Sequence, residues 1–149
     1  MSAPRRSRNA QRGGRLADIG QDYDRGHVGY VEKLDPAGRF WLKTKPFSAP
    51  PNEELARCLR TFAHVVELLQ LGTRAQVLDV GCGPGWFSEF LVRCGYSVTG
   101  VDISPDMVGI ARGRVAAIGE IGEGIHAQAE FHAMPVRQMP WSSRFEAAI

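Results

Sequence analysis

The stretch VLDVGCGPGWFSEFL, residues 77–91, decides the fold of this chain. It begins with an apolar run typical of a buried strand, passes through three glycines at alternate positions, and continues in a helical pattern. Glycines in a strand-to-helix turn let the main chain approach a ligand closely, at an entropic cost that a turn without a ligand would avoid. The stretch therefore predicts a binding loop at the carboxyl end of a strand.

Strand and helix patterns alternate around this loop. Alternation of this kind predicts an α/β fold with a doubly wound parallel sheet. Ser104 can cap a helix whose first position is Pro105. The expected helices are residues 52–72, 85–94 and 104–118, and the expected strands are 76–80, 97–101, 125–132 and 145–149.

The end of the chain bears on the size of the domain. Residues 145–149 resemble a central buried strand, and no helix follows to cover its outer side. A parallel sheet needs cover on both faces. We therefore expect residues 52–149 to be the N-terminal part of a domain that is incomplete at its C-terminus.

The N-terminal third of the chain has a different composition. Residues 1–15 hold five arginines and no acidic residue, with few apolar side chains to bury, which predicts a disordered basic tail. Such a tail could be a plain solvated leader, a transit segment, or a contact for nucleic acid or anionic lipid. Residues 16–51 are rich in aromatics, proline and glycine, which favours a helical or irregular cap packed on the body. Turn residues between Val31 and Trp41 favour a short hairpin within it.

Composition narrows the class of protein further. No apolar tract is long enough to span a bilayer, and three cysteines without close pairing favour a reduced, cytoplasmic setting. The four histidines show no metal-ligand spacing with one another or with the cysteines, so we expect no metal site. The body lacks a basic stripe interleaved with aromatics, which makes a nucleic-acid partner unfavoured. The sequence does not indicate an oligomeric state.

Spacing and charge select the ligand of the loop. The dinucleotide pattern G-x-G-x-x-G has its third glycine in the sixth place, which Trp86 occupies here. A pyrophosphate beside Gly81 would also meet the carboxylate of Asp79, a like-charge contact. A nucleoside that carries an ammonium and a sulfonium group fits this charge better.

These residues resemble a known family. Asp79-x-Gly81-x-Gly83-x-Gly85 after one strand, followed by GVDISPDM at residues 100–107 after the next, is similar to the class I S-adenosylmethionine-dependent methyltransferases. The resemblance covers roughly residues 53–149. It implies a Rossmann-like sheet, S-adenosylmethionine as cofactor, and methyl transfer as the activity.

The resemblance also implies roles for particular residues. Asp102 matches the acid that accepts both ribose hydroxyls, and Ile103 and Met107 match the apolar residues that flank the adenine. The residues matched to the methionine end of the cofactor are Asp79, Gly81, Cys82, Gly83 and Gly85. The family often bonds the adenine amino group through an acid after the third strand, but Pro135 stands at that place here.

The methyl acceptor is less defined than the cofactor. No residue is identified as a catalytic base, and we expect a small-molecule acceptor. Two alternatives stay open. One is a non-catalytic or truncated methyltransferase-like module; the other is a nicotinamide-dependent oxidoreductase, against which Asp79 and Trp86 argue.

Overall fold

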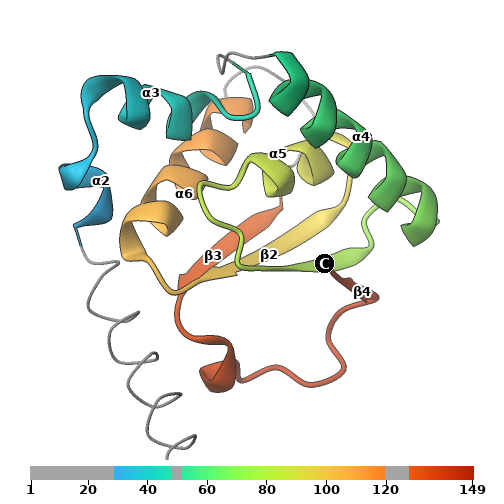
Figure 1. Cartoon of the computed structure of the whole chain (residues 1–149). Coiled ribbons are helices and arrows are strands. Elements are labelled where there is room, and N and C mark those ends of the chain that lie inside the picture. Colours follow the sequence, from blue (N-terminus) through green and yellow to red (C-terminus); the bar gives the residue numbers. More distant parts are fainter. Residues whose placement is uncertain (1–28, 48–51, 120–127) are drawn as a thin grey trace, which may run out of the picture.

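The protein is built on one parallel sheet of four strands (Figure 1). The computed structural model describes residues 29–47, 52–119 and 128–149, so the predicted basic tail, part of the predicted cap and the first residues of the strand expected at 125–132 lie outside it. The strands follow the order β3-β2-β1-β4. Their bounds are β1 Gln76–Val80, β2 Ser97–Asp102, β3 Ala129–Ala133 and β4 Ala147–Ala148.

The strand order reverses at β1. The chain runs from β1 outward to β2 and β3, and then returns to pair β4 with the other side of β1, where Val77 lies opposite Ala147. A reversal of this kind is the topological switch point at which open α/β sheets bind their ligands. The parallel, Rossmann-like sheet is confirmed, and the glycine loop leaves β1 at the switch point.

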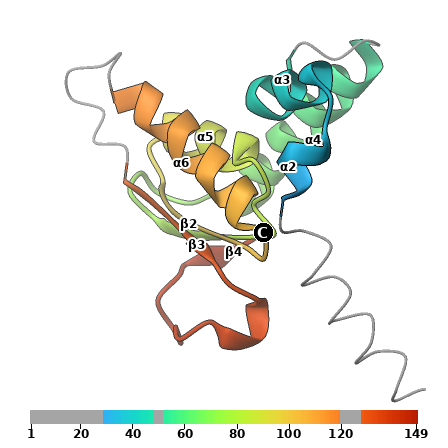
Figure 2. The same cartoon turned by 90° about the vertical axis from the view of Figure 1, so that its left-hand side faces the viewer.

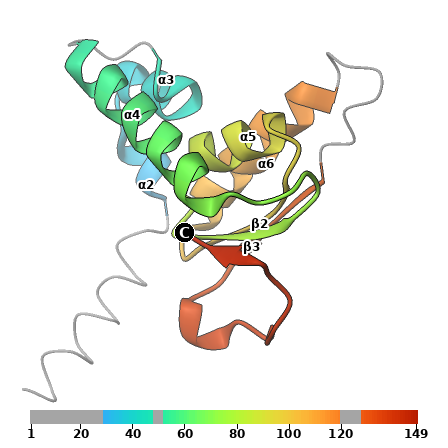
Figure 3. The same ribbon diagram turned by 90° about the vertical axis from the view of Figure 1, so that its right-hand side faces the viewer.

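Three helices cover one face of the sheet, as Figures 2 and 3 show. They are α4 Asn52–Leu69, α5 Trp86–Arg93 and α6 Pro105–Gly119. Phe62 of α4 packs edge-on against the rings of Phe87 and Phe90, each with centroids 5.2 Å away. The buried core between helices and sheet is apolar and contains Val77, Cys82, Leu91, Val92, Tyr96, Val98, Val108, Ala111, Val115, Ile118 and Phe131.

The opposite face of the sheet carries a polar ladder. Ser97 Oγ donates to Gln128 Oε1 at 2.9 Å, and Thr99 Oγ1 donates to Glu130 Oε1 at 3.0 Å. The segment between β3 and β4, with the short helix η1 Val136–Gln138, lies on this side (Figure 2). Its Arg144 pairs with Glu130 at 2.5 Å. The polar side chains of these strands therefore bond to one another and to this segment.

The expected hairpin between Val31 and Trp41 is wrong, because this segment is helical. It forms α2 Tyr30–Lys33 and α3 Pro36–Thr44, which we call the cap helices. The carboxylate of Asp35 accepts from the amide of Gly38 at 2.7 Å, and Pro36 takes the first helical position. Asp-Pro suits a helix start as well as a turn, since proline there has no N–H that needs a partner.

The helices of the body and the strands β1 and β2 lie close to their predicted bounds, whereas β3 begins only at Ala129 and β4 covers two of the five residues expected. Ser104 caps α6 as expected, since its Oγ accepts from Met107 N at 3.4 Å. Gly95 ends the α5 segment with a positive φ of 90°. Among the described helices, none combines the length and apolar character that crossing a bilayer would require.

Candidate functional site

A cavity of about 600 Å³ opens at the carboxyl ends of β1 and β2. This volume lies within the usual range of ~300–1,000 Å³ for small-molecule sites. The glycine loop, the end of β2, the start of α6, the segment after β3 and the cap helices all contribute to it. Its lining residues are Tyr30, Leu42, Val80, Gly81, Gly83, Pro84, Val101, Asp102, Ile103, Ser104, Met107, Met134, Pro135 and Val136.

The glycine loop offers bare backbone to this cavity. Gly81 has a φ of 76° and Gly83 a φ of 52°, in the left-handed region that glycine adopts without strain. A Cβ placed on Gly81 would have no other atom within 4 Å, so the space above its backbone is open. The amide of Gly81 donates to Val101 O of the neighbouring strand at 2.7 Å, which fixes the loop. This wall can hold a ligand against its main chain.

Asp102 brings a fixed negative charge to the rim. Its Oδ2 accepts from the amide of Gly83 at 2.9 Å, and its Oδ1 accepts from the amide of Ser104 at 2.8 Å. A carboxylate has about four acceptor positions, so these two bonds leave capacity on both oxygens. The carboxylate is therefore held in place and can still receive hydroxyl donors from a ligand.

Apolar side chains form the walls beyond Asp102. Ile103 and Met107 come from the start of α6, and Met134 and Val136 from the segment after β3. Pro135 lines the cavity as well, and its carbonyl accepts from the amide of Gln138 at 2.9 Å. These walls suit a flat apolar ring, while Pro135 brings neither an N–H nor a side-chain acceptor to it.

Asp79 lies outside the lining of the cavity. Its side chain is buried, with 6% exposure, and its Oδ2 accepts from the fully buried hydroxyl of Ser88 on α5 at 2.5 Å. Burial raises the pKa of Asp79 above its ordinary value; the Ser88 hydrogen bond opposes this rise and the charge of Asp102 adds to it. Asp79 therefore brings a buried carboxyl group to the base of the glycine loop.

Cys82 and Gly85 also lie outside the lining. Cys82 is buried in the core, and that burial raises the pKa of its thiol. A Cβ on Gly85 would lie 2.6 Å from the Cβ of Ala111 on α6, closer than atoms can approach. Gly85 therefore lets α6 pack against the start of α5. Five of the eight predicted residues line the cavity, namely Gly81, Gly83, Asp102, Ile103 and Met107.

The sequence predicted a cap from the aromatic segment between Tyr23 and Phe47, but it did not show which residues of that segment line the cavity. Tyr30 and Leu42 line the cavity from α2 and α3. The available signal was the helix start at Asp35-Pro36, which we interpreted as a turn. A helix there carries the buried Leu42 to the cavity.

Known proteins match this chain over its sheet. Residues 77–149 match the family model described as "Methyltransferase domain". The ubiquinone biosynthesis O-methyltransferase of Xanthomonas campestris pv. campestris (strain B100) is 53% identical over 38 residues, which are 26% of this chain and 16% of that protein. The match thus spans less than a fifth of the relative's length.

Two solved structures share the fold. Magnesium protoporphyrin IX methyltransferase from Synechocystis PCC 6803 with bound SAM has a TM-score of 0.58 and 22% identity over 79% of this chain and 57% of its own. The [4+2]-cyclase SpnF has a TM-score of 0.53 and 26% identity over 60% of this chain and 32% of its own.

The family match, the sheet order and the glycine loop agree with one another. Residues 77–149 of this chain are thus similar to the methyltransferase domain family, and the described sheet has the fold of a structure solved with bound SAM.

Proposed function

We propose that the chain binds S-adenosylmethionine in the cavity at the ends of β1 and β2 and transfers its methyl group to a small-molecule acceptor. The observation that carries the proposal is the carboxylate of Asp102. It is fixed by the amides of Gly83 and Ser104 at the rim of a cavity that has bare backbone on one side and apolar walls on the other.

The residues present fit the cofactor in three ways. Asp102 has acceptor capacity for two ribose hydroxyls, and the slot of Ile103 and Met107 suits the adenine ring. The open space at Gly81 leaves room for the methionine end. We propose that Asp79 acts from below the loop, where its charge favours the cationic end of the ligand. Cys82 and Gly85 then shape the loop without touching the cofactor.

The cofactor, when bound, supplies an activated methyl group on a sulfonium. Because the leaving group is already activated, the protein contributes mainly orientation and exclusion of water. The cap helices would supply the second contribution, since Tyr30 and Leu42 line the cavity from that side of the chain. Among the described lining residues, only Tyr30 and Asp102 have ionisable side chains, and we assign no catalytic base.

The acceptor and the setting are inferred from composition and likeness. The Xanthomonas relative is an O-methyltransferase of ubiquinone biosynthesis, which supports a small-molecule acceptor here. Cys58, Cys82 and Cys94 are free thiols, which supports a reducing cytoplasm.

A second candidate is a cofactor-binding module that does not transfer methyl groups. The SpnF structure has the same fold and is described as a cyclase, so the fold by itself does not select the reaction. Methyl transfer to a hydroxyl group needs a general base. Because few ionisable side chains line the described part of the cavity, transfer to a hydroxyl acceptor is disfavoured and this second candidate gains support.

Calorimetric titration with S-adenosylhomocysteine tests the proposal, with NADH as the control ligand and a thermal melt of the same sample. We expect the homocysteine ligand to bind and NADH not to bind. A chain that melts cooperatively and binds neither ligand would rule the proposal out. Binding of NADH alone would favour the oxidoreductase alternative.

A further inference from the structure

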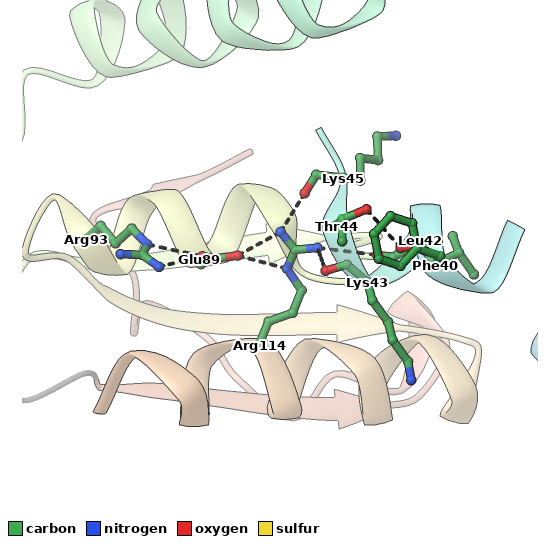
Figure 4. Close-up of polar contacts among 8 residues, drawn as sticks. All are labelled: Phe40, Leu42, Lys43, Thr44, Lys45, Glu89, Arg93 and Arg114. Atoms are coloured by element: carbon green, nitrogen blue, oxygen red, sulfur yellow. Dashed lines mark hydrogen bonds and ion pairs between the residues drawn. The ribbon is translucent and has the colours of Figure 1, made fainter. Parts of the chain in front are cut away.

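The guanidinium of Arg114, on α6, reaches the end of a helix about seventy positions earlier in the chain (Figure 4). Its Nη1 donates to the carbonyls of Leu42 at 3.3 Å and Lys43 at 2.7 Å, and its Nη2 donates to the carbonyl of Lys45 at 2.5 Å. These carbonyls belong to the last turn and the C-cap of α3. Arg114 therefore binds the C-terminus of the second cap helix.

The chemistry of this contact is favourable for two reasons. The last carbonyls of a helix have no intrahelical partner, and the helix dipole places partial negative charge at that end. An arginine supplies five N–H donors in a rigid plane; here the guanidinium makes four hydrogen bonds, and its Nη2 also forms an ion pair with Glu89. Lysine has three donors on one atom and cannot reproduce this fork.

Glu89, on α5, orients the guanidinium. Its Oε2 accepts from Arg114 Nε at 2.9 Å and lies 2.7 Å from Nη2. The two side chains are only 8% and 14% exposed, so the pair is shielded from solvent. The other oxygen of Glu89 pairs with Arg93 at 2.9 Å, but Arg93 is 49% exposed and has no described contact with α3. Substitution of Arg93 therefore removes one ion pair of Glu89 without removing a described contact to α3, which makes it a matched control for substitution of Arg114.

This contact lies beside the cofactor cavity. Leu42 offers its carbonyl to Arg114 while its buried side chain lines the cavity. A second polar contact between the cap helices and α6, from Val31 N to Asp106 Oδ2, is long at 3.5 Å. Phe47, just after α3, adds a ring contact to Phe90 on α5 at 6.0 Å.

We infer that Arg114, aligned by Glu89, is a positioning residue that holds the cap helices closed over the cofactor cavity. The inference rests on the proposed function, because the cavity has to be the cofactor site for its closure to affect cofactor binding. Release of the α3 carbonyls frees Leu42 and Tyr30 to move away from the bound ligand, so the cofactor leaves faster while Asp102 and the glycine loop keep their geometry.

Hydrogen exchange and ligand release together test this inference. The variants are Arg114→Ala, Arg114→Lys and Glu89→Gln, with Arg93→Ala as the control. Amide exchange is followed in residues 36–47 and, as an internal reference, in β1 and β2. Release of bound labelled S-adenosylhomocysteine is followed after an excess of unlabelled ligand is added.

For the two Arg114 variants we expect exchange of residues 36–47 and ligand release each to accelerate at least about tenfold, the factor for losing one charge-assisted hydrogen bond. Glu89→Gln should show a smaller change of the same sign. Arg93→Ala should stay within about twofold, as for an exposed ion pair. Exchange in β1 and β2 should not change.

Several results would overturn the inference. One is an Arg114→Lys variant whose α3 exchange and ligand release match those of the parent chain. Another is faster α3 exchange without faster ligand release, which would make the contact purely structural. If Arg114→Ala does not fold, Arg114→Lys and Glu89→Gln decide, since both keep most of the side-chain volume. If the parent chain does not bind the ligand, the proposed function is refuted instead. Hydrogen exchange needs no ligand, so it still shows whether Arg114 holds α3 and thereby separates failure of the inference from failure of the proposed function.

Discussion

The cavity has two walls of different construction. The strand-end wall, formed by Gly81, Gly83 and Asp102, is tied to neighbouring strands by backbone hydrogen bonds and by the bonds of the Asp102 carboxylate. The cap wall, formed by Tyr30 and Leu42, stands on two short helices held from the side by Arg114. We propose that the first wall recognises the ligand and that the second controls access to it. Substitutions in the two walls should therefore have different consequences.

Asp102→Ala should produce the largest effect on binding. Two charge-assisted hydrogen bonds to the ribose are lost, each worth about 1.5–3 kcal/mol, so the affinity for S-adenosylhomocysteine should fall by at least about 100-fold. Calorimetric titration measures this change. Glu67→Gln, an exposed charge on α4, is the control and should leave the affinity unchanged. A loss below about threefold in Asp102→Ala would mean that the strand-end wall does not hold the ligand.

Gly85→Ala should damage the fold rather than the cavity. The new Cβ would meet Ala111 at 2.6 Å, and the residue would keep a φ of 76°. Overpacking and backbone strain together should lower the free energy of unfolding by about 2–4 kcal/mol, as measured by urea denaturation.

Gly81→Ala is the counterpart within the strand-end wall. It shares the positive φ but has open space around its Cβ. Its stability should fall by only about 1 kcal/mol from backbone strain, while its ligand affinity falls because the methyl group occupies the cavity. Equal loss of stability in Gly81→Ala and Gly85→Ala would contradict the separation of ligand contact from helix packing.

Asp79→Asn should change how stability depends on pH. Burial raises the pKa of Asp79 in the folded state above the ordinary 3.8. Between pH 3.8 and this raised pKa, the folded state therefore binds more protons than the unfolded state. The parent chain should then lose stability as pH rises through this window, and Asp79→Asn should not show that loss. Urea denaturation of both proteins across this window measures the difference. A stability difference between the two proteins that is independent of pH would contradict the shift.

Gly113→Ala should produce the smallest effect. Gly113 lies inside α6 and lines a second cavity between α6 and the cap helices, and a Cβ added to it would have no other atom within 4 Å. Alanine in a helix interior should raise the free energy of unfolding by about 0.5–1 kcal/mol, with ligand affinity unchanged. Thermal and urea denaturation would detect the gain, and a loss of stability would show that this cavity is tighter than described.

The sequence predicted the strand-end wall better than the cap wall. Local signals fix the strand, the glycine loop and the helix start at Ser104, because each depends on neighbouring residues. Sequence could not show that Gly85 faces Ala111 or that Arg114 reaches the end of α3, since both depend on tertiary packing. The Asp35-Pro36 pair was ambiguous between a turn and a helix start, and Arg114 at the other end of α3 helps to stabilise the helix.

An amide chemical-shift map of the chain titrated with S-adenosylhomocysteine would show directly where the ligand binds. We expect the largest changes at Gly81, Gly83, Asp102 and Met107, with Leu42 of the cap wall changing as well. Changes concentrated on the polar face of the sheet, at Thr99 and Glu130, with none at Gly81 or Asp102, would contradict this expectation.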